Sequence, residues 1–165
     1  MHEVIGISGR ARALLEKAES RDSLSLLLVD VAKVHAFEAD SRVNSVACDI
    51  GNSRDLERLI PPDTGAIHHL AAIVSDQADV EFDHGMKINF DTKRSLLEIG
   101  RRLTVPPKHI FTGSPAVFGG NLPEIINDQT AVTPQSSNGT QKAMGELRST
   151  NSSGEVLAGA GTPKA

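Results

Sequence analysis

The amino-acid sequence predicts an α/β fold with a doubly wound parallel sheet. Short apolar runs, such as residues 25–29, alternate along the chain with longer segments of helical periodicity. Apolar runs separated by helices in this way are typical of parallel strands that are buried on both faces. A glycine-containing turn follows the first apolar run, and an acidic residue closes the second. Together these observations favour a strand, turn, helix and strand unit that opens a larger parallel sheet.

The remaining elements follow from the same alternation. Strands are expected at residues 2–5, 25–29, 43–47, 66–70 and 108–112, and helices at 10–19, 53–60, 80–103 and 138–147. Pro106 and Pro107 end the long third helix, because proline cannot continue a helical hydrogen-bond pattern. Residues 1–147 are therefore expected to form one domain. Residues 148–165 are rich in Ser, Gly, Ala and Pro, and are expected to be a low-complexity, disordered tail.

Composition excludes several classes of protein. The net charge of −4 and the absence of Trp and Tyr argue against nucleic acid as a partner, because such proteins usually carry a basic stripe and stacking aromatics. No apolar run approaches the ~20 residues of a membrane-spanning helix, so no membrane contact is expected. The lone Cys48 and the lack of a signal segment favour a soluble protein in the reducing cytoplasm.

The turn after the first strand holds two glycines, Gly6 and Gly9, at the expected opening of the first helix. Free backbone N–H groups and the helix dipole can bind a pyrophosphate there, and a side chain would keep the phosphate away. Asp30 ends the second strand, where a carboxylate can accept hydrogen bonds from an adenosine ribose and disfavour a 2′-phosphate. The alternative is a tight structural turn and a solvated strand end, but the order of the elements favours dinucleotide binding.

Two other possible sites are weaker. His68 and His69 stand near Asp76, Asp79 and His84, but neighbouring strand residues point to opposite faces and no ligand motif fits, so no metal site is predicted. Cys48 has no paired histidine pattern, so we interpret it as buried packing rather than as a nucleophile.

Six segments in chain order carry a more specific pattern. They are residues 6–12 (GISGRAR), 28–30 (LVD), 49–50 (DI), 69–72 (HLAA), 88–92 (INFDT) and 111–119 (FTGSPAVFG). Together they resemble the extended short-chain dehydrogenase/reductase family, also called the NAD-dependent epimerase/dehydratase family. The resemblance covers about residues 3–147. It implies a Rossmann-type sheet, truncated before the C-terminal strands and the substrate lobe of full-length members.

The resemblance also implies roles for individual residues. Gly6 and Gly9 would contact the pyrophosphate of NAD, Asp30 the ribose, and Asp49 and Ile50 the adenine. Ala71 and Asn89 would lie beside the cofactor, with Asn89 also holding a kink in its helix or a water. Arg12 stands where the family has a third glycine. Its bulk lowers the expected NAD affinity, although its charge could reach the pyrophosphate.

At the reacting end the pattern is broken. Ser114 matches the family's serine or threonine that bonds the reacting oxygen, and a strand-end serine that satisfies backbone groups is the alternative. Lys142 matches the lysine of the Tyr-x-x-x-Lys pair, which orients the ribose and lowers the pKa of the tyrosine. Asn138 replaces the tyrosine, and an amide cannot act as a general acid or base near neutral pH. The chain contains no other tyrosine.

Within the family, residues 69–75, 116–119, 122–124 and 139–146 most resemble dehydrogenases that oxidise a small sugar acid with NAD. The expected family activity is therefore oxidation of a secondary hydroxyl by hydride transfer to NAD, impaired here, with a sugar-acid or sugar-derived substrate and a homodimer in relatives. The rival hypotheses are a non-catalytic nucleotide-binding or interaction module and a nonfunctional fragment. Truncation, divergence to a pseudoenzyme and a changed reading frame after Leu147 would all produce such a sequence.

Overall fold

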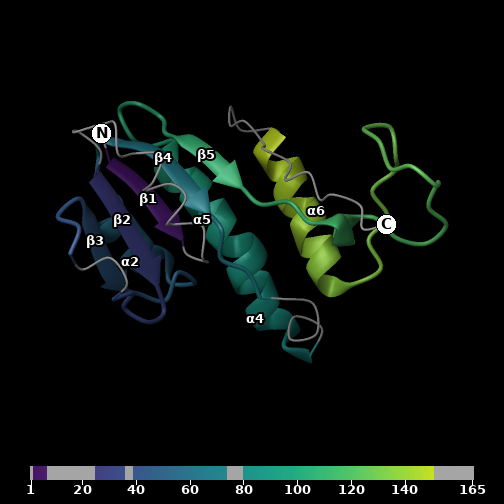
Figure 1. Ribbon diagram of the computed structural model, residues 1–165, viewed down its shortest axis with the longest axis horizontal. Coiled ribbons are helices and arrows are strands. Elements are labelled where there is room, and N and C mark those ends of the chain that lie inside the picture. The colour runs from purple at the N-terminus through teal and green to yellow at the C-terminus, as the bar shows by residue number, and fades with distance from the viewer. Residues whose placement is uncertain (1, 7–24, 36–38, 74–79, 151–165) are drawn as a thin grey trace.

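The sheet is built from five parallel strands, as the sequence predicts. The computed structural model describes residues 2–6, 25–35, 39–73 and 80–150. The strands are β1 (His2–Gly6), β2 (Ser25–Asp30), β3 (Val43–Ala47), β4 (Thr64–His69) and β5 (Lys108–Phe111), in the order β3-β2-β1-β4-β5 (Figure 1). This is the Rossmann-type α/β arrangement, and each predicted strand boundary agrees with the observed one to within two residues.

The strand order places a topological switch point next to β1. The chain runs outward from β1 to β2 and β3, and then returns to place β4 and β5 on the other side of β1. In open α/β sheets, the connections on the two sides of such a switch point generally run to opposite faces of the sheet. In open α/β sheets, ligands bind in the crevice that such diverging loops leave.

The described helices depart from the prediction mainly between residues 80 and 103. Residues 80–103 form three consecutive segments rather than one α-helix, namely α4 (Phe82–Met86), the π-helix η1 (Lys87–Asp91) and α5 (Thr92–Gly100). Helix α2 (Ser53–Leu59) begins at the Asn52 cap, whose side chain accepts a hydrogen bond from the Arg54 backbone. Helix α6 (Ser137–Thr150) extends three residues past the predicted end, and a short 3₁₀ helix, η2 (Pro115–Val117), was not predicted. The predicted helix at 10–19 lies outside the described residues.

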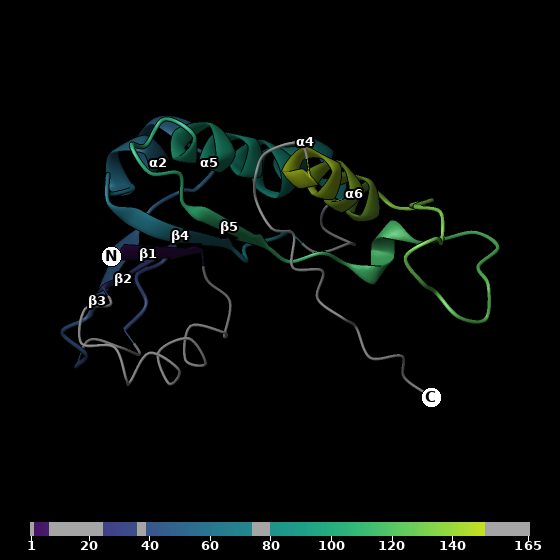
Figure 2. The same cartoon turned by 90° about the horizontal axis from the view of Figure 1, so that it is seen from above.

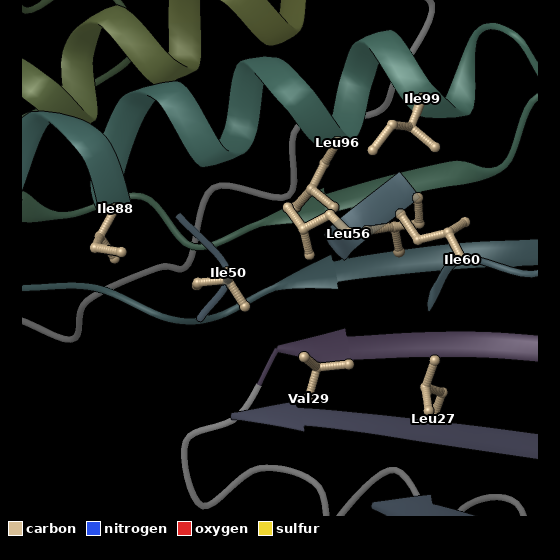
Figure 3. Packing of buried hydrophobic residues seen from close by; sticks show 9 residues of the cluster. Leu27, Val29, Ile50, Leu56, Ile60, Ile88, Leu96 and Ile99 are labelled. Atoms are coloured by element: carbon tan, nitrogen blue, oxygen red, sulfur yellow. The ribbon is translucent and has the colours of Figure 1, made fainter. Parts of the chain in front are cut away.

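One aliphatic core lies between the sheet and the helices α2 and α5, which cover the same face (Figures 2 and 3). Leu27 and Val29 of β2 point toward this core, while Leu26 and Leu28 alternate to the opposite face and are also buried. Burial on both faces explains why this strand is a continuous apolar run. The core cluster consists of Leu27, Val29, Ile50, Leu56, Ile60, Ile67, Ile88, Leu96 and Ile99.

Candidate functional site

The predicted binding residues gather at the carboxyl edge of the sheet. Gly6 is in register with Val29 of β2 and with His69 of β4, so these three strands end at the same level. Asp30 closes β2 one residue later, beside Ala47 of β3. The glycine at the end of β1 therefore lies at the switch point, with a carboxylate on one side and the loop after β4 on the other. Gly9 and Arg12 lie outside the described residues.

Asp30 and Asp49 present carboxylates after neighbouring strands. Asp30 is half-buried, and its Oδ1 accepts a hydrogen bond of 2.6 Å from the backbone N–H of Val31. Asp49 is exposed; its Oδ1 accepts from Gly51 N at 2.8 Å, and its Oδ2 lies 3.3 Å from Lys87 Nζ. The Gly51 hydrogen bond and the nearby ammonium hold the pKa of Asp49 below its usual value. The Asp49 carboxylate is therefore an anionic acceptor, and it is already engaged by Lys87.

Ile50, the other predicted adenine neighbour, is placed differently. Its side chain is buried in the core cluster, and its carbonyl accepts a hydrogen bond from the Thr92 hydroxyl at 3.1 Å. The structure therefore gives Ile50 a packing role at the carboxyl edge.

Asn89 lies in the π-helix and fixes the loop that follows β4. Its Oδ1 accepts from the Ile73 backbone N–H at 2.8 Å, and its Nδ2 donates to the Ile73 carbonyl at 3.0 Å and to Gln141 Oε1 at 2.7 Å. Ala71, half-buried in this loop, packs against the core cluster. A π segment is common where a helix is shaped for function. Asn89 lies at an irregularity of its helix and bonds both the Ile73 backbone and the Gln141 side chain.

Ser114 follows β5 and caps the 3₁₀ helix η2. Its Oγ accepts a hydrogen bond of 3.2 Å from Ala116 N, and its backbone N–H donates to the Glu146 carboxylate of α6. The side chain is half-buried. The capping bond corresponds to the structural alternative predicted for this serine, yet it uses the hydroxyl only as an acceptor.

Helix α6 buries a stripe of polar and small residues. Asn138, Gln141, Lys142, Gly145 and Ser149 recur at helical spacing and are all buried. A helix that served packing alone would place apolar side chains on this face, because a buried polar group costs free energy unless it is bonded. The stripe brings Asn138 and Lys142 onto one face, one turn apart, as the Tyr-x-x-x-Lys spacing requires.

Lys142 reaches the end of β5. Its Nζ donates a 3.1 Å hydrogen bond to the Thr112 carbonyl, two residues before Ser114, and lies 4.6 Å from the centre of the Phe111 ring. Burial lowers the pKa of this lysine, while the nearby Glu146 opposes the shift. Ser114 and Lys142 are therefore brought to the same strand end, with Glu146 between their elements.

A second buried lysine, Lys93 of α5, was missed by the sequence analysis. Its Nζ lies 3.1 Å above the centre of the Phe111 ring, and it has no hydrogen-bond partner among the described residues. Burial, together with the charge of Lys142, lowers the pKa of Lys93 to about 7. A signal existed in the sequence, since position 93 lies one helical turn from Asn89 and from Leu97, which are both buried. Lysine in a helix is, however, normally solvated.

His69 completes the surroundings of Phe111. The imidazole ring centre lies 5.7 Å from that of Phe111, and burial with the charges of Lys142 and Lys93 lowers the pKa of His69 to about 3. The ring is therefore neutral at physiological pH.

Within the described ranges, no group of three or more His, Cys, Asp or Glu side chains is arranged to hold a metal.

Cys48 follows β3 and packs against the core cluster. Burial raises the pKa of its thiol, and the carboxylates of Asp55 and Asp49 add to the shift. A thiol that resists ionisation is a poor nucleophile, which agrees with the packing interpretation.

In the part of the chain that the structure describes, no helix is long and apolar enough to cross a bilayer.

Solved structures share this fold. A nucleoside-diphosphate-sugar epimerase from Agrobacterium tumefaciens superposes with a TM-score of 0.84 at 32% identity, covering 100% of this chain and 56% of that protein. A UDP-Glc/GlcNAc 4-epimerase from Campylobacter jejuni gives a TM-score of 0.81 at 17% identity, with 99% and 58% coverage. The second likeness concerns the fold alone.

Sequence relatives are more specific. Two D-erythronate dehydrogenases, from Cupriavidus necator and Haemophilus influenzae, are each 48% identical over 122 residues, or 74% of this chain. The match covers only 37% and 39% of those proteins. These relatives confirm the resemblance to sugar-acid dehydrogenases. The model of the NAD dependent epimerase/dehydratase family matches residues 3–156, and the chain therefore belongs to that family.

Proposed function

We propose that the chain is an NAD-binding domain of the sugar-acid dehydrogenase type, with impaired dehydrogenase chemistry. The observation that carries this proposal is the gathering of Gly6, Asp30, Ser114 and Lys142 at the carboxyl ends of β1, β2 and β5, around the switch point. That edge is where α/β sheets bind nucleotides. The family to which the chain belongs is NAD dependent, which supports the choice of cofactor.

The donors and acceptors at this edge suit a dinucleotide. The Asp30 carboxylate is an acceptor for ribose hydroxyls and repels a 2′-phosphate, and Asp49 offers a second carboxylate for an adenine amino group. At the other end, the Lys142 ammonium suits the second ribose and the Ser114 hydroxyl suits a reacting oxygen. NAD, when bound, accepts a hydride from the substrate carbon. The chain's own residues supply orientation and charge.

Proton transfer is the step that this chain lacks. Oxidation of a hydroxyl releases a proton, and in the family a phenol on the α6 face takes it. Asn138 occupies that position, buried in the first turn of α6. An amide does not titrate near neutral pH, and a missing general base typically lowers the rate by about 10²- to 10⁴-fold. Ser114 and Lys142 can then still position the substrate and the cofactor, but the proton acceptor at position 138 is missing.

The substrate class follows from the relatives. The 48% identity with D-erythronate dehydrogenases supports a small sugar acid or sugar derivative, although the chain spans less than two fifths of those proteins. The second candidate function is a non-catalytic nucleotide-binding or interaction module. The absence of any tyrosine from the 165 residues favours this candidate. A cytoplasmic homodimer with a domain at 1–147 and a tail at 148–165 belongs to the same proposal, except that residues 148–150 form the last turn of α6.

Calorimetric titration with NADH and NADPH tests the function. We expect NADH to bind at least about tenfold more tightly, a difference of about 1.4 kcal/mol, because Asp30 repels the 2′-phosphate. Asp30→Ala should reduce this preference, whereas Asp128→Ala, in an exposed loop, should leave it unchanged. No binding of either nucleotide would refute the proposed function, and equal binding of both would refute the role of Asp30.

A further inference from the structure

Gln141 is a buried polar residue whose burial needs an explanation. It follows Asn138 by three residues on α6, and its side chain is completely shielded from solvent. Its Oε1 accepts a 2.7 Å hydrogen bond from Asn89 Nδ2, and Asn89 is also completely buried. The two residues stand 52 positions apart in the chain. Burying two amides costs free energy unless they are hydrogen-bonded, and a bonded pair holds its neighbours in one arrangement that apolar side chains would not specify.

The orientation of both amides is set by the backbone. The N–H of Ile73 can only donate, so the group of Asn89 that faces it must be the carbonyl, Oδ1. The Asn89 amino group is then directed to the Ile73 carbonyl and to Gln141, which must present its own carbonyl. Gln141 Nε2 consequently points away and has no partner among the described residues. These hydrogen bonds fix the orientation of both amides and link the backbone of Ile73 through Asn89 to α6.

We propose that Gln141 is a positioning residue, which holds the backbone of Ile73 through Asn89. The inference rests on the proposed function, because the loop that begins after β4 lies at the switch point where the dinucleotide is expected. Helix α6 carries Lys142 directly after Gln141 in the sequence. The contact therefore couples the loop on one side of the expected cofactor to the helix that supplies its ribose ligand. Gln141 acts on the ligand through Asn89 and does not touch it.

Two substitutions at position 141 separate the acceptor from the rest of the side chain. Gln141→Leu removes the acceptor and leaves the Asn89 amino group with one partner fewer. Gln141→Glu is of similar size and keeps a carbonyl oxygen toward Asn89. Ser149→Ala is the matched control, because Ser149 is also buried on α6 but its hydroxyl bonds only the Gly145 carbonyl of its own helix. NADH affinity and hydrogen exchange at the Ile73 amide are measured for the parent and all three variants.

We expect Gln141→Leu to weaken NADH binding about tenfold, the factor typical of one lost buried hydrogen bond, and to speed exchange at Ile73 by a similar factor. Gln141→Glu should stay within about threefold of the parent in both, and Ser149→Ala should change neither. Unchanged exchange at Ile73 in Gln141→Leu, or faster exchange with unchanged NADH affinity, overturns the inference. An equal effect of Ser149→Ala also overturns it. If the parent binds no NADH, the proposed function fails, and exchange at Ile73 alone decides whether Gln141 holds the loop.

Discussion

The buried amine of Lys93 illustrates how a single residue can set the pH dependence of stability. It lies against Phe111, and the titratable groups around it include Lys142, Glu146, His69 and His109. One carboxylate faces two lysines, so the local charge is not balanced when both amines are protonated. The ring face attracts a cation, but a buried charge remains costly without full hydrogen bonding. The neutral amine is therefore the form that the folded protein accommodates best.

Stability should rise with pH between about 7 and 10.5. The pKa of Lys93 is about 7 in the folded protein against 10.5 ordinarily, so over this range the unfolded chain holds more protons. Above pH 10.5 the amine is neutral in both the folded and the unfolded chain, so Lys93 does not lower the free energy of unfolding. Below pH 7 the amine is protonated in both, and its full destabilising effect applies. Lys93→Met should increase the free energy of unfolding at neutral pH by about 1–4 kcal/mol and flatten this slope. Urea denaturation at several pH values measures both; a variant with the parental slope would contradict the explanation.

Restoring the phenol should not restore an enzyme. Asn138→Tyr supplies the missing phenol, but the 165 residues match only 37% and 39% of the D-erythronate dehydrogenases, so an expressed piece of this length does not include what the other parts of those proteins contribute. Orientation of a substrate can be worth several kcal/mol of barrier. We expect neither the parent nor Asn138→Tyr to turn over small sugar acids efficiently, as followed by NADH absorbance.

The control for that assay is Asn138→Tyr combined with Lys142→Ala, which removes the residue that would lower the tyrosine pKa. Clear turnover by the parent would refute impaired chemistry. Robust turnover by Asn138→Tyr alone would show that the 165 residues already contain a sufficient substrate site.

At the scale of elements, helix α6 depends on close approach at Gly139. A Cβ atom at this position would clash with the backbone carbonyl of Ala116, which belongs to η2 directly after Ser114. At Gly145, by contrast, a Cβ atom would lie 3.2 Å from the edge of the Phe111 ring and 3.4 Å from the Lys93 side chain. Backbone yields less readily than side chains, so the two glycines of one helix should respond differently to the same substitution.

Gly139→Ala should destabilise the protein by about 1–3 kcal/mol, because overpacking against backbone outweighs the gain of about 0.5–1 kcal/mol in helix propensity. Gly145→Ala should change stability by less than about 1 kcal/mol, since Phe111 and Lys93 can shift. Thermal or urea unfolding of the pair provides the comparison. Equal stability of the two variants would show that the α6 to η2 contact is not tight.

The strands were predictable because each is a short apolar run with its own boundary residues. β2 shows this best, since it is a continuous buried apolar run of a strand's length, bounded by Ser25 and Asp30. The position of Asp30 followed directly from the end of its strand, whereas Ser114 was identified through the resemblance of residues 111–119 to a family motif. The π segment at 87–91 was not predictable, because its extra residue per turn is stabilised by tertiary bonds of Asn89 and Thr92 rather than by local propensity. The burial of Lys93 and Gln141 was not predicted, because it depends on how α5 and α6 pack together.

At the scale of the whole molecule, the described part leaves apolar surface uncovered. The loop between η2 and α6 exposes Leu122, Ile125, Ile126 and Val132. Figure 1 shows this segment extending beyond α6, away from the sheet. The outer strands of the described sheet, β3 and β5, also have one edge each without a neighbouring strand among the described residues. Exposed apolar patches and open sheet edges favour association with other chains.

The purified chain should therefore self-associate as its concentration rises. Ile125→Lys should shift it toward monomer in sedimentation velocity, because Ile125 is 74% exposed within the apolar loop. Val105→Lys is the matched control, since Val105 is 72% exposed in the turn between α5 and β5. A chain that remains monomeric at all concentrations and unfolds cooperatively at high temperature would contradict this expectation.

The π segment between α4 and α5 has a geometric consequence for the whole arrangement. Successive residues of an α-helix are rotated by about 100°, so one additional residue in a turn changes the rotational phase of everything that precedes it. Helix α4 packs against α6, whereas α5 packs against both α2 and α6. The phase change allows one continuous helical rod to match two surfaces that a regular helix would present out of alignment. A deletion within residues 87–91 would therefore act mainly as a rotation of α4 about its own axis.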